Sequence, residues 1–146
     1  VPVSCSLPPR YRRRLFRCGA YGTILPFVQQ ESTFWRRSLM DLVDLDTLAT
    51  YRLAGDHFLW QCFSRRTDLC IVASFLGAWR QHQGQLSSRY RDVYVAEVAA
   101  MSRRMTPIDL AVAAFDSLAR FAPTRTRKYL NRRRLFLFDV KRNEWR

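Results

Sequence analysis

A carboxylate stands between a glycine and a dense aromatic segment near the middle of the chain. The segment is Gly55-Asp56-His57-Phe58-Leu59-Trp60. In this setting the side chain of Asp56 could take a proton from an attacking hydroxyl, which is the role of a general base. It could also cap a helix that starts beside it, a structural role that contributes about 1 kcal/mol. On this spacing alone, the helix cap is the simpler interpretation.

Two further segments carry groups that could join such chemistry. Residues 30–32 (QES) place a carboxylate, Glu31, directly before an aromatic and basic run. Residues 80–82 (RQH) place a histidine, His82, after an apolar stretch. A neutral imidazole is a good ligand for a divalent metal ion. The carboxylate of Glu31 could hydrogen-bond a substrate hydroxyl, support a neighbouring arginine or cap the helix that follows.

Three motifs follow one another in the order QESTFWRR (residues 30–37), AGDHFLW (54–60) and RQHQGQ (80–85). In this order they resemble the C-terminal half of glycosyltransferase family 2 enzymes, which have the GT-A type of fold. The resemblance covers roughly residues 24–90. It implies an inverting transfer from a nucleotide sugar, with Asp56 as general base toward the acceptor hydroxyl. The implied partners are a nucleotide-sugar donor and a carbohydrate or lipid-linked acceptor.

The resemblance also implies roles for other residues of these motifs. His82 would complete the coordination of a divalent metal ion, Mn²⁺ or Mg²⁺, that the sugar diphosphate holds. Glu31 would lie near the acceptor cleft. The ring of Trp60 could stack on a sugar, unless it belongs to the core. His57 matches no metal ligand of the family and is expected to be structural.

The segment Asp44-Leu45-Asp46 has the DxD pattern that these enzymes use to hold metal and nucleotide. In the family this pattern ends a strand far upstream of the catalytic carboxylate, whereas here it stands a short way before Asp56, so we expect a solvated turn. Residues 1–30 contain no alternating strands and helices for the family's nucleotide-binding sheet. The expected class is α/β: a helix-rich, partial GT-A-like domain with two or three short strands and most of that sheet missing.

Such a chain would be the acceptor-side part of a longer enzyme or a truncated, inactive relative. It should bind the donor poorly by itself, because the donor-binding half and its DxD are absent from it. An inactive relative could self-associate through the sheet edge that the missing strands leave open.

The net charge of +13 over 146 residues is concentrated at the ends of the chain. Residues 1–40 carry +6 and residues 120–146 carry +8, while residues 41–119 carry −1. Such ends suit phosphate-rich partners, so the alternative function is a non-catalytic basic module that binds nucleic acid or an anionic membrane surface. No nucleic-acid-binding motif is present, which makes nucleic acid the less favoured partner. A solvated charged surface would also explain the charge.

The composition indicates a folded domain. Apolar residues make up 48% of the chain, which is too many for a disordered segment. The apolar run from Leu69 to Trp79 is too short to cross a bilayer, and no signal peptide is recognisable. The four cysteines have neither CxxC nor zinc-type spacing, and Cys62 and Cys70 are expected to be buried thiols. These features favour the cytoplasm, with peripheral contact at the inner face of the membrane through the basic ends.

Four segments are expected along the chain: an extended, basic Pro/Arg-rich arm (1–22), the glycosyltransferase-like segment (23–90), a two-helix segment (91–123) and a basic tail (124–146). Apolar spacing predicts a strand over 69–75 and helices over 33–43, 58–65, 91–105 and 107–122. The run 135–138 in the tail is expected to be an amphipathic surface segment or an edge strand.

The two-helix segment has the clearest signals. Tyr94, Val98, Met101 and Met105 recur on one helical face. Thr106 precedes Pro107 and Asp109, which is typical of a capped helix start. That second helix has an apolar stripe, which consists of Ile108, Val112, Phe115 and Leu118.

Overall fold

The computed structural model describes residues 10–74, 76–77, 89–132 and 134–145, and short helices account for most of its regular structure. The helices are α1 (Arg13–Arg17), the 3₁₀ helices η1 (Gln30–Ser32) and η2 (Arg37–Leu42), α2 (Leu45–Thr50), α3 (Gly55–Phe63), α5 (Arg91–Met101), α6 (Pro107–Ala119) and α7 (Thr124–Asn131). The strands are β1 (Ile71–Val72), β2 (Leu135–Phe136), β3 (Phe138–Asp139) and β4 (Glu144–Trp145). The chain is therefore a mixed helix and strand protein, as predicted, but its described residues form four short strands rather than two or three. Among its described helices, none combines the length and hydrophobicity needed to cross a bilayer.

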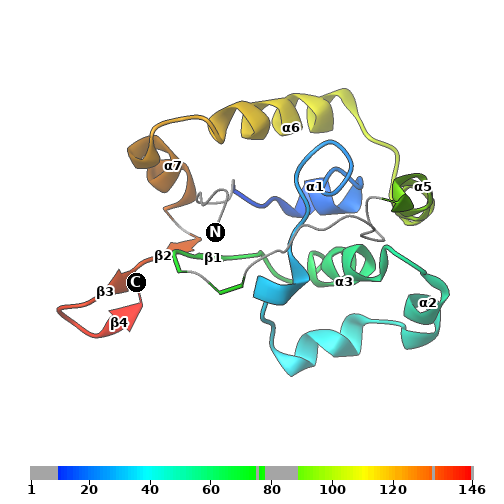
Figure 1. Cartoon of the computed structure of the whole chain (residues 1–146), viewed down its shortest axis with the longest axis horizontal. Coiled ribbons are helices and arrows are strands. Elements are labelled where there is room, and N and C mark those ends of the chain that lie inside the picture. Colours follow the sequence, from blue (N-terminus) through cyan, green and yellow to red (C-terminus); the bar gives the residue numbers. More distant parts are fainter. Residues whose placement is uncertain (1–9, 75, 78–88, 133, 146) are drawn as a thin grey trace.

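Figure 1 shows α6 along one edge of the molecule and α2 with the 3₁₀ turns toward the opposite edge. Helices α1 and α3 lie between these two edges. The strands lie at the end of the molecule where α7 leads into the tail.

The four strands form two separate two-stranded sheets. β1 pairs with β2 in parallel, which places Ile71 opposite Leu135. β3 and β4 form an antiparallel hairpin with Asn143 in its turn at φ 54°, a conformation that asparagine adopts more readily than most residues. Of the strand predicted over residues 69–75, the described residues form only Ile71–Val72. The tail contains strands, which is one of the two forms predicted for it. The parallel pairing of β1 with β2 joins the tail to the middle of the chain through backbone hydrogen bonds.

The main core lies where α1 packs against α3. Leu15 and Phe16 of α1 are buried, and the ring of Tyr21 lies 4.4 Å from that of Phe16 between centroids. The aromatic residues of α3 complete the cluster. Burial of each large apolar side chain contributes about 1.5–3 kcal/mol. The prediction of an extended, basic arm is therefore wrong over residues 13–17, which form α1. The helix places Leu15 and Phe16 in the core, between arginines that lie outside it.

Helix α6 meets the core with its acidic side rather than its apolar side. Its buried residues are Asp109, Ala113 and Asp116. In contrast, Ile108 is 62% exposed and Leu118 is 73% exposed. Of the apolar stripe identified in the sequence, Val112 packs against the core, whereas Ile108, Phe115 and Leu118 face away from it.

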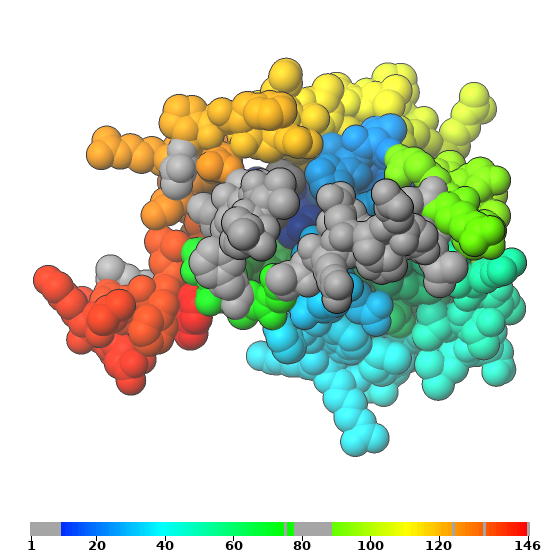
Figure 2. All heavy atoms as spheres, viewed as in Figure 1, coloured from blue at the N-terminus to red at the C-terminus, as the bar shows by residue number. Residues whose placement is uncertain are grey.

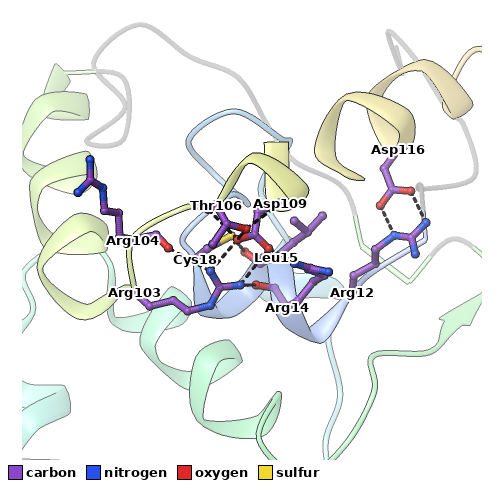
Figure 3. Close-up of polar contacts among 9 residues, drawn as sticks. All are labelled: Arg12, Arg14, Leu15, Cys18, Arg103, Arg104, Thr106, Asp109 and Asp116. Atoms are coloured by element: carbon purple, nitrogen blue, oxygen red, sulfur yellow. Dashed lines mark hydrogen bonds and ion pairs between the residues drawn. The ribbon is translucent and has the colours of Figure 1, made fainter. Parts of the chain in front are cut away.

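Arginines from other segments explain this orientation, as Figure 3 shows. Arg12 donates two hydrogen bonds to Asp116, at 2.6 and 2.8 Å. Asp109 accepts one from Arg14 at 2.8 Å and two from Arg103, at 2.6 and 2.9 Å. A buried carboxylate stays ionised only with such partners. The ion pairs thus decide which side of α6 turns inward.

The junction between α5 and α6 follows the predicted pattern. Tyr94 and Val98 of α5 are buried. The N–H of Asp109 donates to the hydroxyl of Thr106 at 3.3 Å, and the N–H of Thr106 donates to the Asp109 carboxylate at 2.9 Å. This reciprocal pair is a capping box. α5 ends at Met101, earlier than predicted, and the N–H of Arg103 bonds the carbonyl of Arg17 instead of continuing the helix.

Two other local predictions are corrected. Residues 33–43 do not form one capped α-helix, because the hydroxyl of Thr33 donates back to the carbonyl of Gln29 at 2.7 Å and the following turn, η2, is a 3₁₀ helix. Cys62 is buried as expected, but Cys70 is exposed. Cys70 has apolar neighbours in the sequence but lies outside the core, because it precedes the short strand β1 instead of lying within a longer strand.

Candidate active site

Asp56 lies in the first turn of α3, one residue after the helix begins at Gly55. Ala54 occupies the N-cap position and no side chain caps the helix, so the cap role considered for Asp56 is not the one it has. Its Oδ1 accepts a hydrogen bond from the N–H of His57 at 2.6 Å. A carboxylate at this end of a helix interacts favourably with the helix dipole. The side chain of Asp56 therefore lies in the first turn of α3 and does not cap the helix.

Partial burial raises the pKa of Asp56 above its usual value. The negative charge of Glu31 adds to the increase, whereas the backbone N–H of His57 acts in the opposite direction. In the described part of the chain, no cation forms an ion pair with Asp56. A carboxylate that is kept basic in this way is suited to take up a proton.

Glu31 lies in η1, where its side chain is exposed to solvent. Its charge acts on Asp56, so the structure brings two of the predicted site carboxylates into one region. Gly77 borders the same region, since a Cβ at that position would lie 3.1 Å from the carbonyl oxygen of Glu31. The chain at Gly77 therefore lies beside the QES motif of residues 30–32.

The loop before α3 is held by Glu97 of α5, a residue that the sequence did not single out. Its carboxylate accepts the backbone N–H groups of Arg52, Leu53 and Ala54 at 2.8, 2.9 and 2.8 Å. Three charge-assisted hydrogen bonds fix the path of the chain into α3 and hence the place of Asp56. No sequence signal marked Glu97, because its partners are backbone groups that lie far from it in the chain.

Tyr94 borders this region from α5. Burial raises the pKa of its phenol, and the charge of Asp56 raises it further. A Cβ on Gly22, whose φ is 81°, would lie 2.5 Å from the Tyr94 hydroxyl. The phenol therefore stays protonated near neutral pH and adds no charge beside Asp56. Spacing predicted Tyr94 as a core residue but not its closeness to the candidate base.

Two other residues of the central motif lie in the core. His57 is 2% exposed, and burial lowers its pKa to about 4, so its ring is neutral near pH 7. Trp60 is 5% exposed and packs against Trp35 and Phe63, with ring centroids 5.6 and 5.9 Å apart. A buried ring offers no face to a sugar. The position of Trp60 therefore does not suit the stacking role considered for it.

The predicted metal ligand, His82, lies outside the described residues. Within residues 10–74, 76–77, 89–132 and 134–145, no three His, Cys, Asp or Glu side chains gather as a metal-binding group. The DxD segment lies at the start of α2, where Asp44 accepts hydrogen bonds from the N–H of Asp46 at 3.1 Å and from the hydroxyl of Thr47 at 2.5 Å. Asp44 is thus a helix cap, and the role of Mn²⁺ or Mg²⁺ stays a prediction.

Among the described residues of this region, Asp56 is the carboxylate whose raised pKa suits it to take up a proton. The charge of Glu31 raises the pKa of Asp56 at the start of α3. Glu97 holds the backbone of residues 52–54, which leads into that helix. In comparisons with known proteins, no family model, no curated protein and no solved structure matched the chain.

Proposed function

We propose that residues 23–90 form the acceptor-side part of an inverting nucleotide-sugar glycosyltransferase of family 2 type, with Asp56 as its general base. One observation carries the proposal: a carboxylate with a raised pKa lies at the start of α3, close to Glu31 of the upstream motif. The order of the three motifs along the chain supports the same function.

The reaction is a single displacement at the anomeric carbon of the donor sugar. The acceptor oxygen forms a bond to that carbon while Asp56 takes the hydroxyl proton. The bond between the anomeric carbon and the diphosphate oxygen breaks, and the nucleoside diphosphate leaves with the electron pair. Because attack and departure take place on opposite faces, the configuration inverts. A raised pKa makes Asp56 a stronger base for this proton.

Other residues would support this step. Glu31 is proposed to hydrogen-bond an acceptor hydroxyl, because its exposed side chain lies near Asp56. Glu97 is a positioning residue, since it holds the loop that leads into α3. His82 is the proposed metal ligand by its motif. A bound Mn²⁺ or Mg²⁺ would supply positive charge to the departing diphosphate.

The test is sugar transfer by the native gene product, purified from its own cells and assayed with a panel of nucleotide sugars. Asp56→Asn should lower kcat by at least about 100-fold, since general base catalysis contributes about 10²–10⁴, and the near-UV circular dichroism should not change. The matched control is Asp44→Asn, which removes an exposed carboxylate but leaves a residue that caps helices equally well. Full turnover by Asp56→Asn would contradict the assignment.

A second candidate function is the binding of a phosphate-rich ligand, and a cleft of about 300 Å³ favours it. The cleft is lined by Arg10, Tyr129, Leu130, Asn131, Arg132 and Arg134. Burial lowers the pKa of Arg10, as do the charges of Arg134 and Arg12, whereas Asp116 and Asp68, which pair with those two arginines, act in the opposite direction. An anion in the cleft would add negative charge beside Arg10. Pyrophosphate binding that weakens with salt and in Arg10→Gln would support this function, and no binding to the wild-type chain would exclude it.

A further inference from the structure

We propose that the outer face of α6 binds the surface of an anionic lipid bilayer, with the helix lying in the plane of the interface. Charge alone pointed to the basic ends of the chain as a membrane contact, whereas the structure points to an apolar helix face between them. The inference does not rest on the proposed glycosyl transfer, because it depends on α6 and α7 and not on Asp56.

Every exposed residue within α6 is apolar. Ile108, Leu110, Phe115 and Leu118 are 62%, 51%, 51% and 73% exposed, and Phe121, just after the helix, is 77% exposed. The remaining exposed positions of the helix are Pro107, Ala111 and Ala114. Residues that follow one another at three- and four-residue steps share one side of a helix. A continuous exposed apolar surface of this kind marks a binding site.

The apolar face stays exposed because of the ion pairs on the opposite side of α6. Asp109 contacts Arg14 and Arg103, and Asp116 contacts Arg12 (Figure 3). Rotating α6 to bury its apolar face would separate both carboxylates from their partners. The apolar face therefore points to solvent in the folded chain. Burying it requires a partner other than the described residues.

The stretch of chain that contains α6 and α7 carries cations and no exposed carboxylate. Between Arg103 and Phe138 the sequence contains two acidic residues, and both are buried in ion pairs. The exposed cations of the same stretch include Arg104, Arg120, Arg125, Lys128 and Arg132. Within the described ranges, none of these five forms an ion pair. Figures 1 and 2 show α6 and α7 as neighbours along the outer edge of the molecule.

This combination fits an anionic bilayer better than other partners. Helices that lie in the membrane interface insert an apolar face among the lipids and place Lys and Arg among anionic headgroups. A two-fold dimer through α6 would bring two sets of cations together without exposed carboxylates from α6 or α7 to pair with them. Nucleic acid would need cations on the outward side of α6 itself to contact phosphates, and that side has none among its exposed residues.

The test is co-sedimentation of the full chain with phosphatidylcholine vesicles that contain or lack phosphatidylglycerol. Leu118→Gln/Phe121→Gln should weaken binding to the anionic vesicles at least about tenfold, because two large apolar groups no longer insert. The matched control is Phe34→Gln/Leu45→Gln, which alters side chains that are 75% and 61% exposed in the segment on the opposite edge of Figure 1. This control should bind like the wild type. Vesicles without phosphatidylglycerol should bind more weakly, and added salt should reduce binding.

Three results would overturn the proposal. The first is a wild-type chain that binds neither kind of vesicle. The second is equal binding by Leu118→Gln/Phe121→Gln and the wild type, which would assign the contact to charge or to another surface. The third is a wild-type dimer that becomes monomeric in this variant without vesicle binding, since a second copy would then cover α6. Both variants should keep the wild-type circular dichroism spectrum, because the substituted side chains are exposed.

Discussion

Arg12 and Asp116 form a two-pronged ion pair between residues that are 104 positions apart in the sequence. Nε of Arg12 lies 2.6 Å from Oδ2 of Asp116, and Nη2 lies 2.8 Å from Oδ1. This parallel geometry suits a guanidinium and a carboxylate. It attaches the second half of α6 to the segment before α1 and so holds the apolar face of α6 toward solvent.

Asp116→Asn should lower the free energy of unfolding by about 2 kcal/mol, because it leaves Arg12 with a neutral partner. The expected loss is below the 3–5 kcal/mol typical of a broken buried pair, as the Arg12 side chain is 26% exposed. Urea unfolding at neutral pH measures it. The matched control is Glu144→Gln, which removes a surface ion pair with Arg142 at 3.9 Å. This variant should lower the free energy of unfolding by less than about 0.5 kcal/mol. Equal losses in the two variants would contradict the structural role of Asp116.

His57 should make the protein less stable in mild acid. Burial lowers its pKa to about 4, below the value of about 6.5 in an unfolded chain. The folded state therefore favours the neutral ring. The stability that this preference adds is fully present above pH 6.5 and is lost as the pH falls toward 4. The loss amounts to about 3 kcal/mol.

Urea unfolding over this pH range measures the effect of His57. The comparison is with His57→Leu, which cannot titrate and should show a smaller decline in the free energy of unfolding. An identical decline in both proteins would mean that His57 does not control stability in acid.

Glu97→Gln should lower glycosyl transfer although Glu97 is not proposed to touch the reacting atoms. The amide keeps the size of the side chain but has one acceptor oxygen, so it cannot hold the backbone N–H groups of residues 52–54 in the same way. We expect a stability loss of about 1–2 kcal/mol and a kcat about tenfold lower, with the KM for the donor within about twofold. Asp92→Asn, at an exposed position of α5, is the control. An unchanged kcat in Glu97→Gln would exclude the positioning role.

Gly22→Ala should destabilise the protein by more than about 2 kcal/mol. Its φ of 81° is unfavourable for a residue with a Cβ, and that Cβ would lie 2.5 Å from the buried Tyr94 hydroxyl. Thermal unfolding measures the difference. Gly55→Ala is the control, because its Cβ would meet Leu48 at an ordinary 3.4 Å and alanine favours a helix. Similar melting temperatures for the two variants would refute this account of Gly22.

Sequence patterns predicted the elements whose stabilising contacts are local. Thr106, Pro107 and Asp109 marked the start of α6 correctly, because the groups of a capping box lie within three positions of one another. Tyr94 and Val98 marked the buried side of α5, where helical spacing and burial agree. The predicted strand over residues 69–75 shortened to Ile71–Val72, since its length depends on a distant partner strand.

The candidate site was only partly predictable. Motifs singled out Asp56 and Glu31, but not that their charges would interact. The prediction that α3 starts at residue 58 was three residues late, and the loop before the actual start is held by Glu97 from another helix. Such a contact leaves no periodic signal in either segment, because one partner is backbone and the other lies on a separate helix.

The sequence by itself determined where α6 begins, which positions could carry acid–base chemistry and which helix has an apolar stripe. Only the tertiary structure decided that most of this stripe faces outward and that Leu15 and Phe16 of the arginine-rich segment 13–17 belong to the core. Burying the large side chains of the stripe would gain about 1.5–3 kcal/mol for each. Turning the stripe inward would, however, break the ion pairs that Asp109 and Asp116 form with Arg12, Arg14 and Arg103. Spacing reveals a helical face, but the distant partners determine the direction in which it points.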